Sequence, residues 1–215
     1  MTTQRRVLIA GASGLVGRAA LDALLKDPAV TEIRILSRRT LDDLPHDPRV
    51  RPCITEFTHL DAHADWFQVE QVLCALGTTM RLAGSQAAFR RVDYEYPLAI
   101  GRLARAAGAS HYALVSAAGA NAHSSVFYNL VKGELELGLK ALAWPSLTIA
   151  RPSLLLGDRA EFRLGEIVAK RFGWLTPSAW KPVEAARVAH ALVRGLRENA
   201  PGVVVLENRA LRREP

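Results

Sequence analysis

The feature that most constrains the fold is a short apolar run that ends directly in a cluster of glycines. Residues 7–10 read VLIA, and residues 11–17 read GASGLVG. A short, continuous run of this kind is typical of a strand that is buried on both faces. Apolar residues then recur at helical spacing over 15–27, and Pro28 follows as a stop signal. The pattern predicts a buried strand, a tight turn and an amphipathic helix.

The glycines of this turn suit the binding of a phosphate group. Glycine permits the tight turn, lets the backbone approach a pyrophosphate, and lets the helix pack closely on the strand. The helix N-terminus adds unpaired N–H groups and a partial positive charge. A loop that only makes the turn is the alternative, but the strand before it and the helix after it favour dinucleotide binding. The residues expected at the cofactor here are Gly11, Ala12, Ser13, Gly14, Leu15, Val16 and Gly17.

Strand-like and helix-like segments continue to alternate along the chain. Further strands are expected at 32–37, 49–57, 71–76, 111–117, 146–152 and 203–206, and further helices at 85–107, 125–143 and 183–198. Strands joined by helices require crossover connections and therefore a parallel sheet. We expect an α/β doubly wound parallel sheet, the Rossmann fold, with helices on both faces.

The sequence predicts one domain, because 215 residues match a single core on length. Residues 1–215 are expected to form an NAD(P)-binding Rossmann domain, to which 157–182 and 183–215 contribute a small C-terminal lobe on the substrate side. The first of these segments is irregular, with a short helix and loops. Its Trp174 and Trp180 either roof a substrate pocket or pack the lobe.

Charge and hydropathy narrow the possible partners. The net charge is +7, from 28 basic and 21 acidic residues, which suits anionic small ligands. The arginines occur as scattered pairs without interleaved aromatic residues, so the pattern does not favour a nucleic-acid partner. No apolar run is long enough to cross a membrane, and the first one is too short for a secretory signal. We therefore expect a cytoplasmic protein; no apolar stripe predicts its oligomeric state.

The end of the second expected strand indicates which dinucleotide binds. A site that prefers NAD usually has an acidic residue there, which bonds the ribose 2′-hydroxyl. This chain has Ser37, Arg38 and Arg39 instead. A guanidinium can bind a 2′-phosphate with two charge-assisted hydrogen bonds. The sequence predicts NADP(H), with Arg38 as the main contact and Ser37 assisting; two solvated arginines are the alternative.

Three residues near the fifth expected strand suggest carbonyl chemistry. Ser116 lies at the strand end, and Tyr128 and Lys132 are one turn apart on the next helix. Reduction of a carbonyl by hydride needs a proton for the developing alkoxide. Tyr128 can give that proton, Lys132 can favour the ionised tyrosine by its charge, and Ser116 can hold the substrate oxygen. A chance pair on a helix surface is the alternative. Gly133 and Gly138 indicate close packing of this helix.

An ordered series of motifs carries a family resemblance over nearly the whole chain. GASGLVG, ILSRR, ALGTT, RVDYEYPLAIGRLARAAG, YNLVKGE, ARPSLLLGDR and LENRA occur in this order. The chain resembles the atypical short-chain dehydrogenases/reductases, in the group that includes the HIV Tat-interacting protein and its bacterial relatives. The resemblance implies an NADP(H)-dependent oxidoreductase that acts on a small carbonyl or alcohol substrate. A regulatory protein that binds NADPH without turnover is the alternative, because some atypical members are of that sort.

The resemblance also implies further cofactor contacts and one departure. The adenine is expected near Glu56 and Phe57. The adenosine ribose is expected at the end of the fourth strand, beside Leu76, Gly77, Thr78 and Thr79. The nicotinamide is expected at the end of the sixth strand, beside Arg151, Pro152, Ser153 and Leu154. Lys132 is also expected to bond the nicotinamide ribose. Many short-chain reductases have an asparagine where this chain has Asp93, which calls the usual proton relay into question.

Two other groups of reactive residues predict no site. His59, Asp61, His63 and Asp65 alternate, but their spacing fixes no third metal ligand, so no metal is expected. Cys53 and Cys74 lie in or beside apolar runs and are expected to be buried free thiols.

Overall fold

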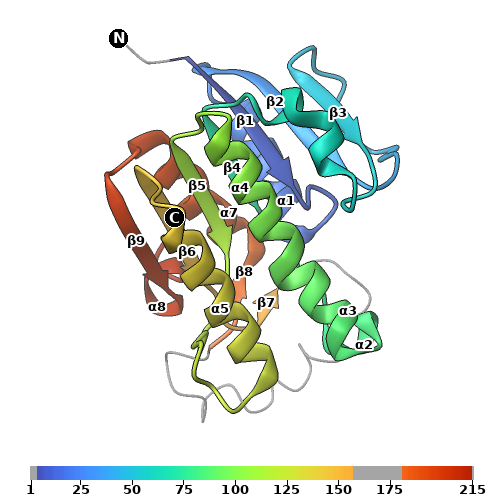
Figure 1. Cartoon of the computed structure of the whole chain (residues 1–215). Helices are drawn as coiled ribbons and strands as arrows, with labels where there is room; N and C mark the ends of the chain where they lie inside the picture. Colours follow the sequence, from blue (N-terminus) through green and yellow to red (C-terminus); the bar gives the residue numbers. More distant parts are fainter. Residues whose placement is uncertain (1–3, 157–180, 215) are drawn as a thin grey trace.

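A computed structural model describes residues 4–156 and 181–214. Its main feature is a parallel sheet of seven strands in the order β3-β2-β1-β4-β5-β6-β9 (Figure 1). The strands are β1 (Arg5–Ala10), β2 (Val30–Ser37), β3 (Val50–Ile54), β4 (Gln71–Cys74), β5 (His111–Val115), β6 (Ser146–Arg151) and β9 (Gly202–Glu207). The prediction of a doubly wound Rossmann fold is confirmed.

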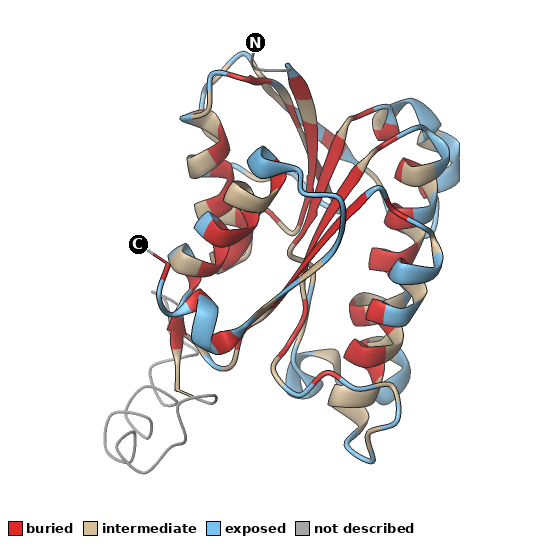
Figure 2. Cartoon of the chain, turned by 90° about the vertical axis from the view of Figure 1, so that its left-hand side faces the viewer, coloured by how far each residue is buried: buried red, intermediate tan, exposed pale blue. Residues whose placement is uncertain are grey.

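Helices cover both faces of this sheet. Helices α1 (Leu15–Leu25) and α7 (Ala185–Glu198) pack on one face, and the 3₁₀ helix η1 (Leu60–Phe67), α4 (Tyr96–Ala106) and α5 (Phe127–Ala141) pack on the other. Figure 2 shows buried residues along the sheet and on the helix sides that face it. The other described helices are short: α2 (Met80–Ala83), α3 (Gln86–Arg90), the π-helical turn η2 (Arg91–Glu95) and α8 (Asn208–Leu211).

The apolar strand sequences follow from burial on two sides. In β1, Val7 and Ile9 pack into the core beneath α1 and α7, while Leu8 and Ala10 pack into the core beneath α4 and α5. A strand whose successive side chains enter two different cores must be apolar throughout. This explains why the first expected strand lacks any polar alternation.

The expected strand at 49–57 is shorter in the structure, because β3 covers only Val50–Ile54 at the edge of the sheet. Pro52 belongs to this strand. Proline is tolerated at a sheet edge, where its missing N–H leaves no neighbouring strand without a partner.

The expected helix at 85–107 consists of three pieces: α3, η2 and α4. In η2 the N–H of Tyr96 bonds the carbonyl of Arg91, five residues back. Pro97 follows in the first turn of α4 and has no N–H to continue the regular ladder. The wide turn points Asp93 into the protein, where it is buried. Gly108 ends the helix with a φ of +97°, as its C-cap position predicts.

The C-terminal part differs from the expected small lobe. Strand β9 pairs with β6 and so belongs to the main sheet, and α7 packs into the same core as α1. Helix α7 is thus built into the Rossmann core, where its apolar face is buried, and β9 is a largely exposed strand at the edge of the main sheet. A separate two-stranded sheet joins β7 (Leu155–Leu156) to β8 (Val183–Glu184). Trp174, Trp180 and the short helix expected within 158–182 lie outside the described residues.

The two cysteines and the histidine-containing segment at 59–65 make ordinary packing contacts. Cys53 and Cys74 are buried free thiols, and burial raises the pKa of Cys53 to about 11. His63 stacks on Trp66 with ring centroids 3.9 Å apart. Among residues 4–156 and 181–214, no group of three or more metal-ligating side chains comes together. No helix in these two stretches has the length and apolar character needed to cross a bilayer.

Candidate active site

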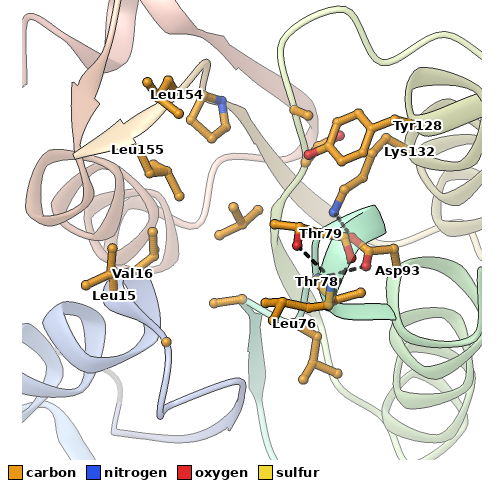
Figure 3. Close-up of a pocket in the computed structure, with 18 of the residues that line it drawn as sticks. Leu15, Val16, Leu76, Thr78, Thr79, Asp93, Tyr128, Lys132, Leu154 and Leu155 are labelled. Carbon is orange, nitrogen blue, oxygen red and sulfur yellow. Dashed lines mark hydrogen bonds and ion pairs between the residues drawn. The ribbon is translucent and has the colours of Figure 1, made fainter. Parts of the chain in front are cut away.

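A cavity of about 510 Å³ opens at the carboxyl ends of the central strands (Figure 3). Parallel strands all end at one edge of the sheet, so the loops that follow them meet there. The cavity is lined by Gly14, Leu15, Val16, Ala75, Leu76, Gly77, Thr78, Thr79, Met80, Arg81, Leu82, Asp93, Val115, Ser116, Ala117, Tyr128, Lys132, Pro152, Ser153, Leu154 and Leu155.

The structure brings Ser116, Tyr128 and Lys132 together on this cavity, as the sequence predicts. Ser116 directly follows β5, and its N–H bonds the carbonyl of Ala150 at 2.8 Å, so β6 fixes its backbone. Tyr128 and Lys132 project from α5 one turn apart. The Tyr128 ring packs on the buried ring of Phe89, with centroids 5.5 Å apart. A hydroxyl, a phenol and an ammonium therefore share one wall.

Lys132 forms a buried ion pair with Asp93, and Figure 3 shows the two side chains pointing toward each other. The Nζ–Oδ1 distance is 2.7 Å, and the side chains are 4% and 1% exposed. The N–H of Thr78 donates to the other carboxylate oxygen at 2.9 Å. Burial acts to lower the pKa of Lys132, but the charge of Asp93, the interaction with Tyr128 and the bond to Asp93 raise it overall. The lysine is therefore held as an ammonium, with a carboxylate beside it.

Ser116 also has a buried acidic partner, which the sequence analysis missed. Its Oγ lies 2.5 Å from Oε1 of Glu136, which is 2% exposed. Arg151 holds the same carboxylate with two hydrogen bonds and reaches Glu207 at 2.9 Å. Because these two carboxylates hold the Arg151 side chain, it is not among the residues that line the cavity, although we expected it at the nicotinamide. Glu136 was identifiable in principle, because it lies one turn beyond Lys132 on an otherwise apolar helix face.

The glycine loop requires glycine at two of its three positions. Gly11 has a φ of +91°, and a Cβ there would lie 2.6 Å from the backbone of Ala75. A Cβ on Gly17 would lie 2.1 Å from the carbonyl oxygen of Gly11. Gly11, Ala12, Ser13 and Gly17 shape the loop, while Gly14, Leu15 and Val16 face the cavity. The loop thus leaves backbone close to a cavity in the way that a bound pyrophosphate requires.

The other expected cofactor residues fall into three groups. Seven of them line the cavity at the ends of β4 and β6: Leu76, Gly77, Thr78, Thr79, Pro152, Ser153 and Leu154. Ser37, Arg38 and Arg39 lie at the end of β2, outside the cavity lining, and both arginines are exposed. Glu56 is exposed, whereas Phe57 is buried and packs edge-on against Tyr96 with centroids 5.3 Å apart. Phe57 therefore belongs to the core in this structure.

Helix α2 forms a further part of the cavity wall. Met80, Arg81 and Leu82 come from this short helix, where Met80 is 38% and Leu82 is 58% exposed. Thr79 caps the helix by accepting the N–H of Leu82 at 3.1 Å. The threonine after ALGT is the one local signal for such a helix.

Known proteins resemble this chain over most of its length. It is 36% identical to the protein HTATIP2 of Rattus norvegicus over 215 residues, which covers 96% of this chain and 88% of the relative. The chain belongs to the atypical short-chain dehydrogenases/reductases. The predicted resemblance to this family is confirmed. No protein-family model matches the chain.

Fungal members of the atypical short-chain dehydrogenases/reductases correct one expectation. The mitochondrial protein fmp52 of Emericella nidulans is 35% identical over 77% of this chain and 73% of its own length. The mitochondrial protein FMP52 of Candida albicans is 32% identical over 86% of this chain and 85% of its own length. Because these relatives are named as mitochondrial proteins, the expectation of a cytoplasmic location is wrong. That expectation depended on the short apolar runs of the sequence, none of which predicts a membrane span or a secretory signal.

Solved structures share the fold of this chain at low sequence identity. The enzyme WbmH of Bordetella bronchiseptica in complex with NAD+ has a TM-score of 0.74 at 12% identity, over 95% of this chain and 75% of its own. The dTDP-glucose 4,6-dehydratase DesIV of Streptomyces venezuelae, with NAD and TYD bound, has a TM-score of 0.73 at 17% identity, over 96% and 79%. At such identities the likeness concerns the fold alone.

Proposed function

We propose that this protein is an NADP(H)-dependent oxidoreductase that transfers hydride between a nicotinamide and a carbonyl or alcohol. One observation supports this above others: a single cavity joins the glycine loop to Ser116, Tyr128 and Lys132. Gly11 and Gly17 fit a dinucleotide, since a Cβ at either position would collide with the backbone of the cradle. The structural neighbours WbmH and DesIV are described with NAD bound, which supports a nicotinamide cofactor here.

The glycine loop and the side chains of Ser116, Tyr128 and Lys132 each have a defined role in this proposal. The bound nicotinamide supplies or accepts the hydride. The glycine loop and the N-terminus of α1 bind the pyrophosphate through backbone N–H groups. Tyr128 gives its hydroxyl proton to the carbonyl oxygen, and the buried ammonium of Lys132 stabilises the tyrosinate that results. Ser116 faces the substrate oxygen from the end of β5.

We expect tighter binding of NADPH than of NADH, because two guanidinium groups are available for the 2′-phosphate. Within the described residues, neither Arg38 nor Arg39 is held in an ion pair, and both are exposed at the end of β2. Titration of each dinucleotide by fluorescence should give a dissociation constant for NADPH at least ~10-fold lower. Arg38→Ala should remove most of this difference and leave the NADH constant unchanged. Equal constants for the two dinucleotides in the wild-type protein would contradict the assignment of NADP(H).

Tyr128→Phe tests the proposed chemistry. The substitution removes one hydroxyl and keeps the ring against Phe89, so the fold should be retained. The loss of a positioned proton donor is expected to lower kcat by about 10²–10⁴-fold, with a small change in NADPH affinity. The measurement is the loss of NADPH absorbance over a panel of aldehydes, ketones and sugar nucleotides. Turnover that survives this substitution would contradict the role of Tyr128.

One observation favours a second candidate, a protein that binds NADPH and does not turn substrate over. The Lys132 ammonium lies 2.7 Å from Asp93, which cancels part of the positive charge that Tyr128 would otherwise feel. Tight NADPH binding by the wild-type protein, with no oxidation across the whole panel, would favour this second candidate. Any substrate-dependent oxidation that requires Tyr128 would favour the enzyme.

A further inference from the structure

Ser116 and Glu136 lie between two cavities. Ser116 lines the 510 Å³ cavity of the proposed active site. Glu136 lines a second cavity of about 280 Å³, together with Asn121, His123 and Arg151. The two side chains meet at 2.5 Å, and each is less than 5% exposed. Their hydrogen bond therefore lies inside the protein, between the two cavities.

The charge of Glu136 determines the direction of this hydrogen bond. Nε and Nη2 of Arg151 donate to its two carboxylate oxygens at 3.0 and 2.6 Å. The hydrogen bond to Glu136 is the largest cause that raises the pKa of Arg151. Burial acts to lower this pKa, but the charge of Glu136 and the interactions with Glu207 raise it further. A carboxylate paired with a guanidinium in this way offers only hydrogen-bond acceptors. Ser116 must then give its single hydroxyl proton to Glu136.

We propose that Glu136 is a positioning residue that makes Ser116 a hydrogen-bond acceptor toward the active-site cavity. This inference rests on the proposed oxidoreductase function. With its proton held by Glu136, Ser116 offers only lone pairs to a ligand. A carbonyl oxygen finds no donor there and depends on Tyr128, whereas the O–H of an alcohol can donate to Ser116. The site should therefore retain an alcohol more tightly than the matching carbonyl compound.

The variant Ser116→Cys tests whether Glu136 interacts with the side chain at position 116, and the test needs no catalytic turnover. In Ser116→Cys, the rate of alkylation by iodoacetamide follows the thiolate fraction. The nearby carboxylate disfavours the thiolate, so adding Glu136→Gln should raise the rate near neutral pH about 10-fold. Glu207→Gln is the matched control: it removes the other carboxylate on Arg151, is 59% exposed, and should change the rate less than about 2-fold. Cys53 and Cys74 are buried, and their background rate is measured in the chain that keeps Ser116.

A comparison of the two ligand states tests the direction of the bond. For any carbonyl–alcohol pair that the wild-type protein converts, Glu136→Gln should lower the KM of the carbonyl and raise the inhibition constant of the alcohol. Glutamine can donate to Ser116 and thereby free its proton for the ligand. We expect the ratio of the two constants to change about 10-fold in Glu136→Gln, because the free energy of one charge-assisted hydrogen bond corresponds to a change of this size. In Glu207→Gln the ratio should stay constant.

The outcomes separate this inference from the proposed function. If Ser116→Cys is alkylated at the same rate with and without Glu136→Gln, or if the ratio of the two constants is unchanged, the role of Glu136 is overturned. Coupling of the thiol to Glu136 without turnover of any compound would instead count against the oxidoreductase and leave the Ser116–Glu136 bond supported. If Glu136→Gln fails to fold because Arg151 loses its partner, the double variant Glu136→Gln/Arg151→Met removes both charges and allows the same comparison.

Discussion

Asp93→Ala is expected to lower the free energy of unfolding by about 3–5 kcal/mol. The reason is the burial of its partner: the Lys132 side chain is 4% exposed and would be left as an ammonium without a counter-charge. The N–H of Thr78 would lose its acceptor as well. Unfolding in urea, followed by circular dichroism, measures the difference. A loss below about 1 kcal/mol would show that water or another group replaces the carboxylate.

Two further variants show whether burial is the cause of this loss. Glu134→Ala breaks the ion pair of Glu134 with Arg90, whose side chains are 30% and 36% exposed, and should cost less than about 1 kcal/mol. The double variant Asp93→Ala/Lys132→Met removes both buried charges. It should be more stable than Asp93→Ala alone, because an apolar side chain can fill the site without a desolvation cost. A double variant that is less stable than Asp93→Ala alone would contradict this account.

Gly133→Ala is expected to cost about 2–3 kcal/mol and to reduce cofactor-dependent function as well. A Cβ at Gly133 would lie 2.2 Å from backbone atoms of both Asn121 and Ala122. The N–H of Asn121 also bonds the carbonyl of Asn129, so this loop and α5 cannot separate without breaking a second contact. The helix that would have to move carries Tyr128 and Lys132. The unfolding free energy and the NADPH dissociation constant should both change.

Gly138 on the same helix provides the matched control. A Cβ there would meet only the end of the Leu98 side chain, at 3.1 Å, and a flexible side chain can shift. Alanine also favours a helix interior over glycine by about 1 kcal/mol. Gly138→Ala should therefore change stability by less than about 1 kcal/mol in either direction. Equal losses for the two variants would mean that general crowding of α5, and not the 121–122 loop, requires glycine.

The fold was predictable because its central strands are buried on both faces. Segments such as 7–10 and 111–117 carry continuous apolar runs that polar surface strands do not show. The position of the final strand was predictable as well, but not its place beside β6, which depends on packing between distant segments. The π-helical turn at 91–95 was not predictable, since its residues have ordinary helix propensities and only Pro97 marks the irregularity.

The candidate site was predictable to the extent that local spacing determines it. Ser116 ends a strand, and Tyr128 and Lys132 are one turn apart, so the Rossmann topology brings them to one edge. Their partners depend on tertiary contacts. Asp93 comes from η2, which α4 separates from β5, and the contact of Ser116 with Glu136 joins a strand end to the second half of α5. Sequence spacing gives no information on such pairs unless a buried charge is noticed on an apolar helix face.

The wide turn at 91–95 also determines how the helical segment before it is rotated about the helix axis relative to the segment after it. Each residue of an α-helix turns the chain by about 100°, so one extra residue in a turn rotates everything before it by that angle relative to everything after it. The segment with Met80, Arg81 and Leu82 precedes the turn, and α4 follows it. Removing one residue from this turn would keep α4 on the sheet and swing α2 to another side of the helix axis. The shape of the cavity mouth thus depends on a single residue of helix length.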